Sequence, residues 1–212
     1  MADCDHIKVT RTTAESTITV LLDDGPRDPD AKRKLNTMLP FFSHMLEQVA
    51  WRSQLNIQID LQLDHFELAH LVTEDVGITL GRAIKEYVDR HYRDGLVGYG
   101  SAFGIIDEAM TRAVISFESR ALLDFTTGPV DVPEQVEGMK SEDMIAFFEG
   151  FVQGAQCTLH LDLLKGRDRH GHHIWESAFR ALGMALQQVM VVSPWRKDMS
   201  AGVCGNIQYQ IE

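Results

Sequence analysis

Two stretches of the sequence follow the same pattern and together decide which fold to expect. The first reads His70-Leu-Val-Thr-Glu74, with Leu80-Gly81-Arg-Ala83-Ile84 after it, and the second reads His172-His-Ile-Trp-Glu176, with Leu182-Gly183-Met-Ala185-Leu186 after it. The matched His, Glu and Gly positions are all 102 residues apart (70 to 172, 74 to 176, 81 to 183). A repeat in register predicts an internal duplication. Coincidence is the alternative, and the apolar and glycine positions by themselves would not exclude it.

The periodicity of apolar residues around these stretches predicts strands and helices in alternation. Residues 55–63 alternate between apolar and polar side chains, as do residues 157–164, so each is expected to be a strand with one buried face. The other expected elements are strands at 17–22 and 113–117, helices at 41–50, 70–91, 141–156 and 172–191, and loops at 23–34, 95–104, 126–138 and 166–171. The order β, α, β, α occurs twice. It predicts an α/β (α+β) fold of two half-repeats, residues 1–102 and 103–212, within one compact domain.

Composition excludes several classes of function. The chain has 212 residues, of which 20 are Lys or Arg and 31 are Asp or Glu, so its formal net charge is −11. This balance argues against binding to nucleic acid or to anionic lipid, since both need clustered cations. No run approaches the roughly 20 apolar residues of a membrane helix, and the first residues do not resemble a signal peptide. Three widely spaced cysteines predict no disulfide framework, so we expect a cytoplasmic protein without a nucleic-acid or membrane partner.

Histidines and glutamates form the most informative chemical pattern. Residues four apart on a helix share a face, so His70 with Glu74 and His172 with Glu176 can each offer an imidazole and a carboxylate to one point. His173 adjoins the second pair, and His160 lies on the polar face of its expected strand. Mixed imidazole and carboxylate donors suit manganese, iron or zinc. A single pair of this kind is commonly only a solvated helix pair, and the duplicated arrangement is what favours a metal site.

Several motifs resemble those of the imidazoleglycerol-phosphate dehydratase family, the hydro-lyases of histidine biosynthesis. The segment 11–16 (RTTAES) resembles the family's Arg-x-Thr-x-Glu-Thr, and 41–46 (FFSHML) resembles Phe-Phe-Asp-His-Met-Leu. The segments 70–81 and 172–181 resemble the family's two His-His-x-x-Glu motifs. Shorter matches are GYG at 98–100, IDEA at 106–109, ESR at 118–120 and TLHL at 158–161. The resemblance extends from Arg11 to about Gly202.

The resemblance implies a fold, an assembly and a set of site residues. The implied fold is a duplicated unit in which two four-stranded sheets sandwich helices, and the implied assembly is a homo-oligomer of about 24 subunits with two-manganese sites between subunits. The implied reaction removes water from a small-molecule substrate through a metal-bound imidazolate, with Glu15, Glu74 and Glu176 as catalytic residues. Glu15, Arg120 and Lys197 are the expected substrate-binding residues. The expected metal ligands are His44, His70, Glu74, His160, His172, His173 and Glu176.

The sequence departs from the family at positions that matter for the metal and for the substrate phosphate. Leu71 replaces the second histidine of the first motif, so we expect one intact metal site and one weakened or empty site. Neither His65 nor His170 has a spacing that makes it a clear substitute. Gly98 stands where the family has an arginine, and Ala201 where it has a lysine, while Arg120 is kept. Arg196 and Lys197 lie near the missing lysine.

These departures leave three functional interpretations. The favoured one is a metal-dependent dehydratase that acts on an imidazole-glycerol-phosphate-like or phosphate-free polyol substrate, because the lost residues are mainly phosphate anchors. The second is an ordinary enzyme of histidine biosynthesis in which the substitutions are compensated locally. The third is a non-catalytic binding protein in which a partial metal site stabilises an oligomer.

Overall fold

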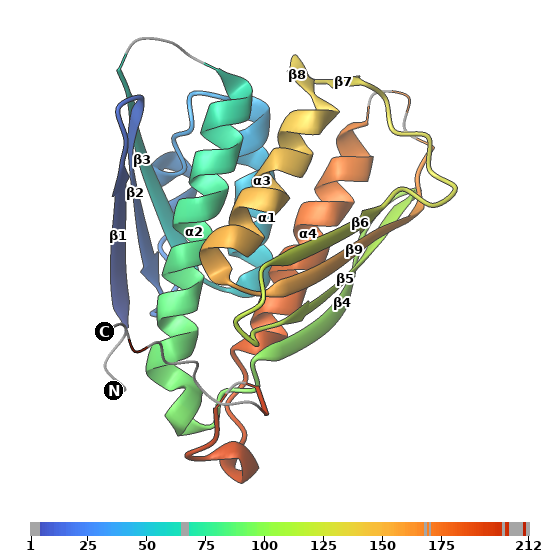
Figure 1. Cartoon of the computed structure of the whole chain (residues 1–212). Coiled ribbons are helices and arrows are strands. Elements are labelled where there is room, and N and C mark those ends of the chain that lie inside the picture. The colour runs from blue at the N-terminus through green and yellow to red at the C-terminus, as the bar shows by residue number, and fades with distance from the viewer. Residues whose placement is uncertain are drawn as a thin grey trace.

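A computed structural model describes residues 5–64, 68–167, 169, 171–200, 202, 203 and 210. Helices form a layer between two β-sheets (Figure 1). The elements are β1 (His6–Thr12), β2 (Ser16–Asp23), η1 (Ala31–Lys34), α1 (Pro40–Ser53), β3 (Asn56–Leu63), α2 (Ala69–His91), η2 (Tyr92–Asp94), β4 (Tyr99–Ile106), β5 (Ala109–Ser116), β6 (Leu122–Thr126), β7 (Gln135–Val136), β8 (Met139–Lys140), α3 (Ser141–Ala155), β9 (Thr158–Lys165), α4 (His172–Val189) and η3 (Pro194–Arg196). None of the described helices is long and apolar enough to cross a membrane.

The two sheets have related but unequal topologies. The second sheet has four strands in the order β4-β5-β9-β6, in which β6 runs parallel to β9. The first has the order β1-β2-β3, so the expectation of a four-stranded first sheet is wrong for the described residues. A single parallel bridge between Leu35 and Ile59 occupies the place that β6 takes in the second sheet. The charged segment before Leu35 contains Pro26 and Pro29, which cannot donate to a strand ladder.

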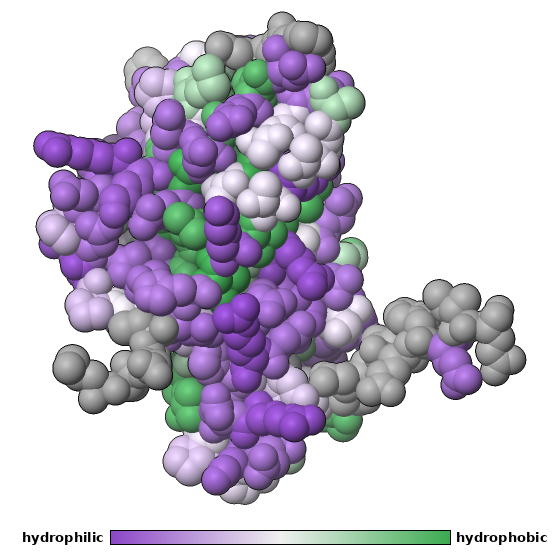
Figure 2. All heavy atoms as spheres, turned by 90° about the vertical axis from the view of Figure 1, so that its left-hand side faces the viewer, coloured by the Kyte–Doolittle hydropathy of each residue, from purple (hydrophilic) through white to green (hydrophobic). Residues whose placement is uncertain are grey.

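The inner face of each sheet is apolar because it packs on the helices. In β3, Ile57, Ile59 and Leu61 are buried while Gln58, Asp60 and Gln62 are more exposed, which confirms the predicted alternation. The same holds for β9, where Leu159, Leu161 and Leu163 are buried. Figure 2 shows that the opposite, outer side of the first sheet carries mainly hydrophilic side chains. The helices therefore supply the interior of the sandwich.

Strand β4 corrects the prediction of a loop over residues 95–104. Gly100 and Gly104 suggested a loop, but their role is to let the strand backbone approach α4. A Cβ at Gly100 would lie within 3.0 Å of the carbonyl oxygen of Ala185, and one at Gly104 would meet that of Ser177 in the same way. The sequence also did not indicate β1, β6 or the short hairpin strands β7 and β8, of which β7 lies within the predicted loop over residues 126–138. The division of the chain at residues 102 and 103 stays a prediction, and this position lies within β4.

Helices α2 and α3 touch backbone to backbone along four glycines. A Cβ at Gly77 or Gly81 of α2 would lie within 3.0 Å of a carbonyl oxygen of α3, and a Cβ at Gly150 or Gly154 would do the same toward α2. The carbonyl oxygen opposite Gly150 belongs to Glu74. The close contact along these glycines therefore fixes the position of the N-terminal part of α2, which carries the expected ligands His70 and Glu74.

Replacing Gly154 by alanine is expected to lower the free energy of unfolding by about 1–3 kcal/mol, the usual cost of overpacking. The new Cβ would meet the Ile78 carbonyl, so the helices must separate. This outweighs the roughly 1 kcal/mol that alanine gains over glycine within a helix. Equilibrium unfolding in urea measures the change. Gln153→Ala, at an exposed neighbouring position of α3, is the control and should stay within about 0.5 kcal/mol of the unaltered chain; equal stabilities of the two variants would contradict the argument.

Candidate metal centre

The first turn of α4 brings His172 and Glu176 together, as their spacing predicts. Gly171 precedes the helix with φ 76°, a conformation that favours glycine, and a Cβ there would lie against the ring of Pro133. Nε2 of His172 lies 3.4 Å from Oε2 of Glu176. The glutamate side chain is only 5% exposed, whereas that of His172 is 33% exposed. The pair thus joins a buried carboxylate to an imidazole at the protein surface.

His44 reaches the same carboxylate from α1. Pro40 occupies the first turn of this helix, as expected, and the buried side chains of Phe42, Met45 and Leu46 fix its orientation in the core. Nε2 of His44 lies 3.8 Å from Oε2 of Glu176, and the rings of His44 and His172 have centroids 5.6 Å apart. The helices therefore converge on one carboxylate oxygen with two ring nitrogens.

These three side chains fit a divalent metal ion. Their donor atoms all lie within 4.8 Å of one another. Nitrogen and oxygen ligands stand about 2.0–2.2 Å from a metal such as zinc, which places neighbouring donors roughly 3–3.5 Å apart. The separations of 3.4 and 3.8 Å from Glu176 are close to that range without being hydrogen bonds. The donor set is of the mixed imidazole and carboxylate type.

Arg180 holds the second oxygen of Glu176. Its guanidinium nitrogen lies 2.5 Å from Oε1 of the glutamate, and it also donates to the side chain of Gln48 and to the carbonyl of Ile105. A buried carboxylate is costly unless it is paired. Arg180 therefore stabilises the charge and leaves Oε2 directed toward the two histidines. Arg180 is not among the residues predicted from the sequence, although its i,i+4 spacing from Glu176 is a signal for such a pair.

His173, the next residue of α4, faces a separate group of acids. Its Nδ1 lies 3.1 Å from Oε1 of Glu108, and Asp107 completes a cluster whose donor atoms lie within 4.8 Å of one another. Both acids lie in the turn between β4 and β5, where Asp107 is exposed. The two adjacent histidines therefore face different clusters in one subunit.

The first His/Glu pair stands at the beginning of α2. Nε2 of His70 lies 3.9 Å from Oε2 of Glu74, and both side chains are well exposed. Glu142, at the start of α3, has its pKa lowered by a hydrogen bond from Lys140 and by the charge of that lysine, with a smaller contribution from His70. Leu71 is half-buried beside His70. Within the described residues of one chain, His70 and Glu74 form no cluster with a third ligand.

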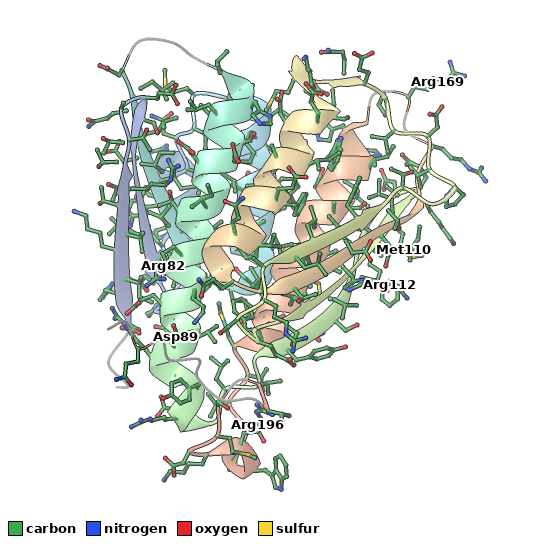
Figure 3. The ribbon with its side chains drawn as sticks, in the orientation of Figure 1. Arg82, Asp89, Met110, Arg112, Arg169 and Arg196 are labelled. Carbon is green, nitrogen blue, oxygen red and sulfur yellow. The ribbon has the colours of Figure 1, made fainter. Side chains whose placement is uncertain are left out.

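His160 lies on the outer side of the second sheet. Its Nδ1 is 3.3 Å from Oδ2 of Asp124 on the neighbouring strand β6. Arg112 projects from the same outer side (Figure 3) and donates two hydrogen bonds to Asp162. Burial raises the pKa of Asp162, but hydrogen bonds from Arg112 and Thr126 outweigh it, so the pKa is lowered overall. Five residues of β9, about 17 Å at 3.3 Å each, separate His160 from the strand end that leads to α4.

The expected substrate-binding residues are exposed and lie on separate parts of the fold. Glu15 lies in the turn between β1 and β2, and Arg120 precedes β6. Lys197 follows the far end of α4, a helix of 18 residues that spans about 27 Å, and neighbouring Arg196 lies at the lower end of the molecule in Figure 3. Ala201, His65 and His170 lie outside the described residues. One subunit therefore does not bring the predicted residues into a single site.

The comparisons with known proteins agree with these motifs. The family model "Imidazoleglycerol-phosphate dehydratase" matches residues 37–186. The imidazoleglycerol-phosphate dehydratase of Ralstonia pickettii (strain 12J) is 37% identical over 190 residues, covering 88% of this chain and 91% of its own. That of Nitrosomonas europaea is 38% identical over 188 residues, covering 88% and 90%.

Solved structures of such enzymes have the same fold. The enzyme of Pyrococcus furiosus in complex with (S)-C348 has a TM-score of 0.73 at 28% identity, covering 87% of this chain and 94% of its own. The enzyme of Staphylococcus aureus also has a TM-score of 0.73, at 26% identity, and covers 88% and 100%. The family match spans well over half of the chain and is supported by relatives above 30% identity. The chain therefore belongs to the imidazoleglycerol-phosphate dehydratase family, whose members are hydro-lyases.

Proposed function

We propose that this protein is a metal-dependent hydro-lyase that eliminates water from an imidazole-glycerol-phosphate-like or phosphate-free polyol substrate. The convergence of His44 and His172 on the buried carboxylate of Glu176 carries this proposal. These three donors retain the ligand chemistry of a metal-dependent family. We propose Mn²⁺ as the metal and the cytoplasm as the location.

Each part of the site has a distinct task in this proposal. A bound metal ion would supply Lewis acidity, stabilising negative charge that develops on the substrate ring. Glu176 and the two histidines would hold the ion, and Arg180 orients the glutamate through its contact with Oε1. Glu15 contacts the substrate and transfers a proton, a role that its exposed position in the β1–β2 turn leaves accessible. Glu74 is proposed to act with His70 at the weakened second metal site.

A complete site requires a second copy of the chain. His44, His70 and His172 lie on helices that begin at the upper end of the molecule in Figure 1, while α4 leads away from that end to the lower end, where Figure 3 labels Arg196, the residue before Lys197. The outer side of the second sheet, which also carries His160, exposes Tyr99, Phe103 and Ile105 on β4 and Leu122 on β6. Large exposed apolar side chains gathered on one face mark an interaction surface. We propose a homo-oligomer of about 24 subunits in which sites form between subunits.

The proposal of a substrate without a phosphate rests on two positions where the family has cationic side chains and this chain does not. Gly98 has φ 69° and is tied into the fold by two backbone hydrogen bonds, from its N–H to Val189 and from Phe117 to its carbonyl. An arginine would be strained in that conformation. Arg196 already donates to the carbonyls of Leu96 and Ser200. Charge-assisted hydrogen bonds contribute roughly 1.5–3 kcal/mol each, so two lost contacts weaken phosphate binding by about a hundredfold or more.

An assay with paired substrates tests this proposal. We expect kcat/KM for dephosphorylated imidazole glycerol to exceed that for imidazoleglycerol phosphate, because the phosphate has lost two cationic partners. Activity is measured on the full-length protein loaded with Mn²⁺, together with its metal content. Full activity on the phosphorylated compound with two ions per subunit would support the ordinary histidine-pathway enzyme instead. Protein that binds no metal and turns over neither compound would favour the binding-protein interpretation.

Replacing His172 by alanine is expected to weaken Mn²⁺ binding by at least about a hundredfold, because changes in the outer shell alone cost 10–100-fold. The loss is measured as free Mn²⁺ by electron paramagnetic resonance during titration. His6→Ala removes an exposed histidine whose ring pairs with Asp23 on the first sheet, and it serves as the control. Equal affinities of the two variants would place the metal elsewhere.

Replacing Leu71 by histidine is expected to increase the number of Mn²⁺ ions bound per subunit. The residue adjoins His70 on α2 and is half-buried, so the new imidazole lies beside the retained pair. Metal analysis after gel filtration measures the stoichiometry. Leu71→Gln, which adds polarity without a ring nitrogen, controls for the change in burial. An unchanged metal count in Leu71→His would show that Leu71 is not what limits the second site.

A further inference from the structure

Four of the five candidate metal histidines share one feature: Nδ1 of the ring lies beside a carboxylate. The pairs, with their N···O distances, are His44 with Glu47 at 3.3 Å, His160 with Asp124 at 3.3 Å, His172 with Glu137 at 3.1 Å and His173 with Glu108 at 3.1 Å. The acids come from different parts of the fold: a helix, a strand and two hairpin turns. Neither family spacing nor helix periodicity requires this recurrence.

The pairing determines which ring nitrogen faces a metal. An ionised carboxylate only accepts hydrogen bonds, so the Nδ1 that faces it carries the proton. In a neutral ring the lone pair then belongs to Nε2. Nε2 is the atom that His44 and His172 both direct toward Oε2 of Glu176. For His44 and His172, the carboxylate at Nδ1 thus lies on the side of the ring away from Glu176 and selects the tautomer suited to binding a metal through Nε2.

The backbone at Glu137 indicates that this contact has a cost. Glu137 and Gly138 form the two-residue turn between the paired residues Val136 and Met139, with φ values of 47° and 81°. Turns of this kind favour Asn-Gly, because a residue at positive φ other than Gly, Asn or Asp is strained. Glutamate is a poor choice for the turn itself. Its longer side chain, however, reaches Nδ1 of His172.

A second turn approaches α4 in a related way. Asp107 and Glu108 join the paired residues Ile106 and Ala109, and Asp107 has φ 43°. This turn presents Glu108 to His173, so the hairpins β7–β8 and β4–β5 each direct a glutamate at one of the two histidines that begin α4. The exposed His172–Glu137 pair adds little to stability by itself. Its main effect is to orient the ring of His172.

We propose that Glu137 is a positioning residue for the metal centre: it accepts the Nδ1–H of His172 and holds the ring so that Nε2 points to the metal. The proposal extends the same role to Glu47 on His44, Glu108 on His173 and Asp124 on His160. It rests on the proposed function, since it presupposes that His172 is a ligand. Such outer-shell carboxylates typically affect metal affinity by 10–100-fold.

Replacing Glu137 by asparagine separates positioning from folding. Asn-Gly suits the turn, so the metal-free variant should unfold at the same or a higher temperature than the unaltered chain. The shorter side chain leaves Nδ1 of His172 without its acceptor, so Kd for Mn²⁺ should rise about 10–100-fold. Glu137→Gln keeps a neutral acceptor at the same reach and should lose less. Titration with Mn²⁺ alone, followed by electron paramagnetic resonance, gives Kd, and the absorption spectrum of bound Co²⁺ reports ligand geometry.

Gln156→Asn is the matched control. Like Glu137, Gln156 has a positive φ, 49°, and it is exposed. It follows the end of α3 and is not one of the predicted residues of the metal centre. Its Kd should equal that of the unaltered chain. Unchanged Kd and Co²⁺ spectrum in Glu137→Asn would overturn the positioning role, and equal losses in the Asn and Gln variants would overturn it in favour of Glu137 as a direct ligand. If the unaltered chain binds no Mn²⁺, the proposed function itself fails.

Discussion

The interaction on which this structure depends most is the burial of the Glu176 carboxylate between α1 and α4. An ionised group in that position is tolerated only with a partner, and Arg180, one turn further along α4, supplies it. The arginine also donates to Gln48 of α1 and to the carbonyl of Ile105 in β4, so one side chain ties two helices and a strand around the glutamate. The packing of the fold and the direction of the ligand oxygen therefore have the same physical cause.

Local geometry explains which parts of this arrangement can be predicted from sequence. The His172–Glu176 pair follows from helix periodicity alone, and the four helices and the strands at β3 and β9 follow from the spacing of their apolar residues. His44 meets Glu176 across 132 residues, a contact that only resemblance to a family could suggest. Glu137 gives no periodic signal at all, because a hairpin turn carries it to His172. Contacts made by turns depend on tertiary packing that sequence patterns do not encode.

Glycine misled the prediction where its function was close packing. Gly100 and Gly104 suggest a loop, yet they belong to β4 because a side chain would separate this strand from α4. On α2 and α3 the same property lets two helix backbones meet, and there the helical periodicity was strong enough to identify both elements. A glycine can permit either close packing against a neighbouring backbone or an unusual φ. Only the residue that packs against it in the folded structure shows which of the two applies.

The negative charge around the beginning of α4 affects both the proposed metal centre and the binding of a substrate phosphate. Glu47, Glu108 and Glu137 lie beside the histidines there, and together they favour a cation and repel an anion. A phosphorylated substrate needs local cations to offset this field. The strained φ that an arginine would have at Gly98 and the engagement of Arg196 with backbone carbonyls remove two possible sources. These acids, together with the two missing cations, are the electrostatic basis of the proposed preference for a substrate without a phosphate.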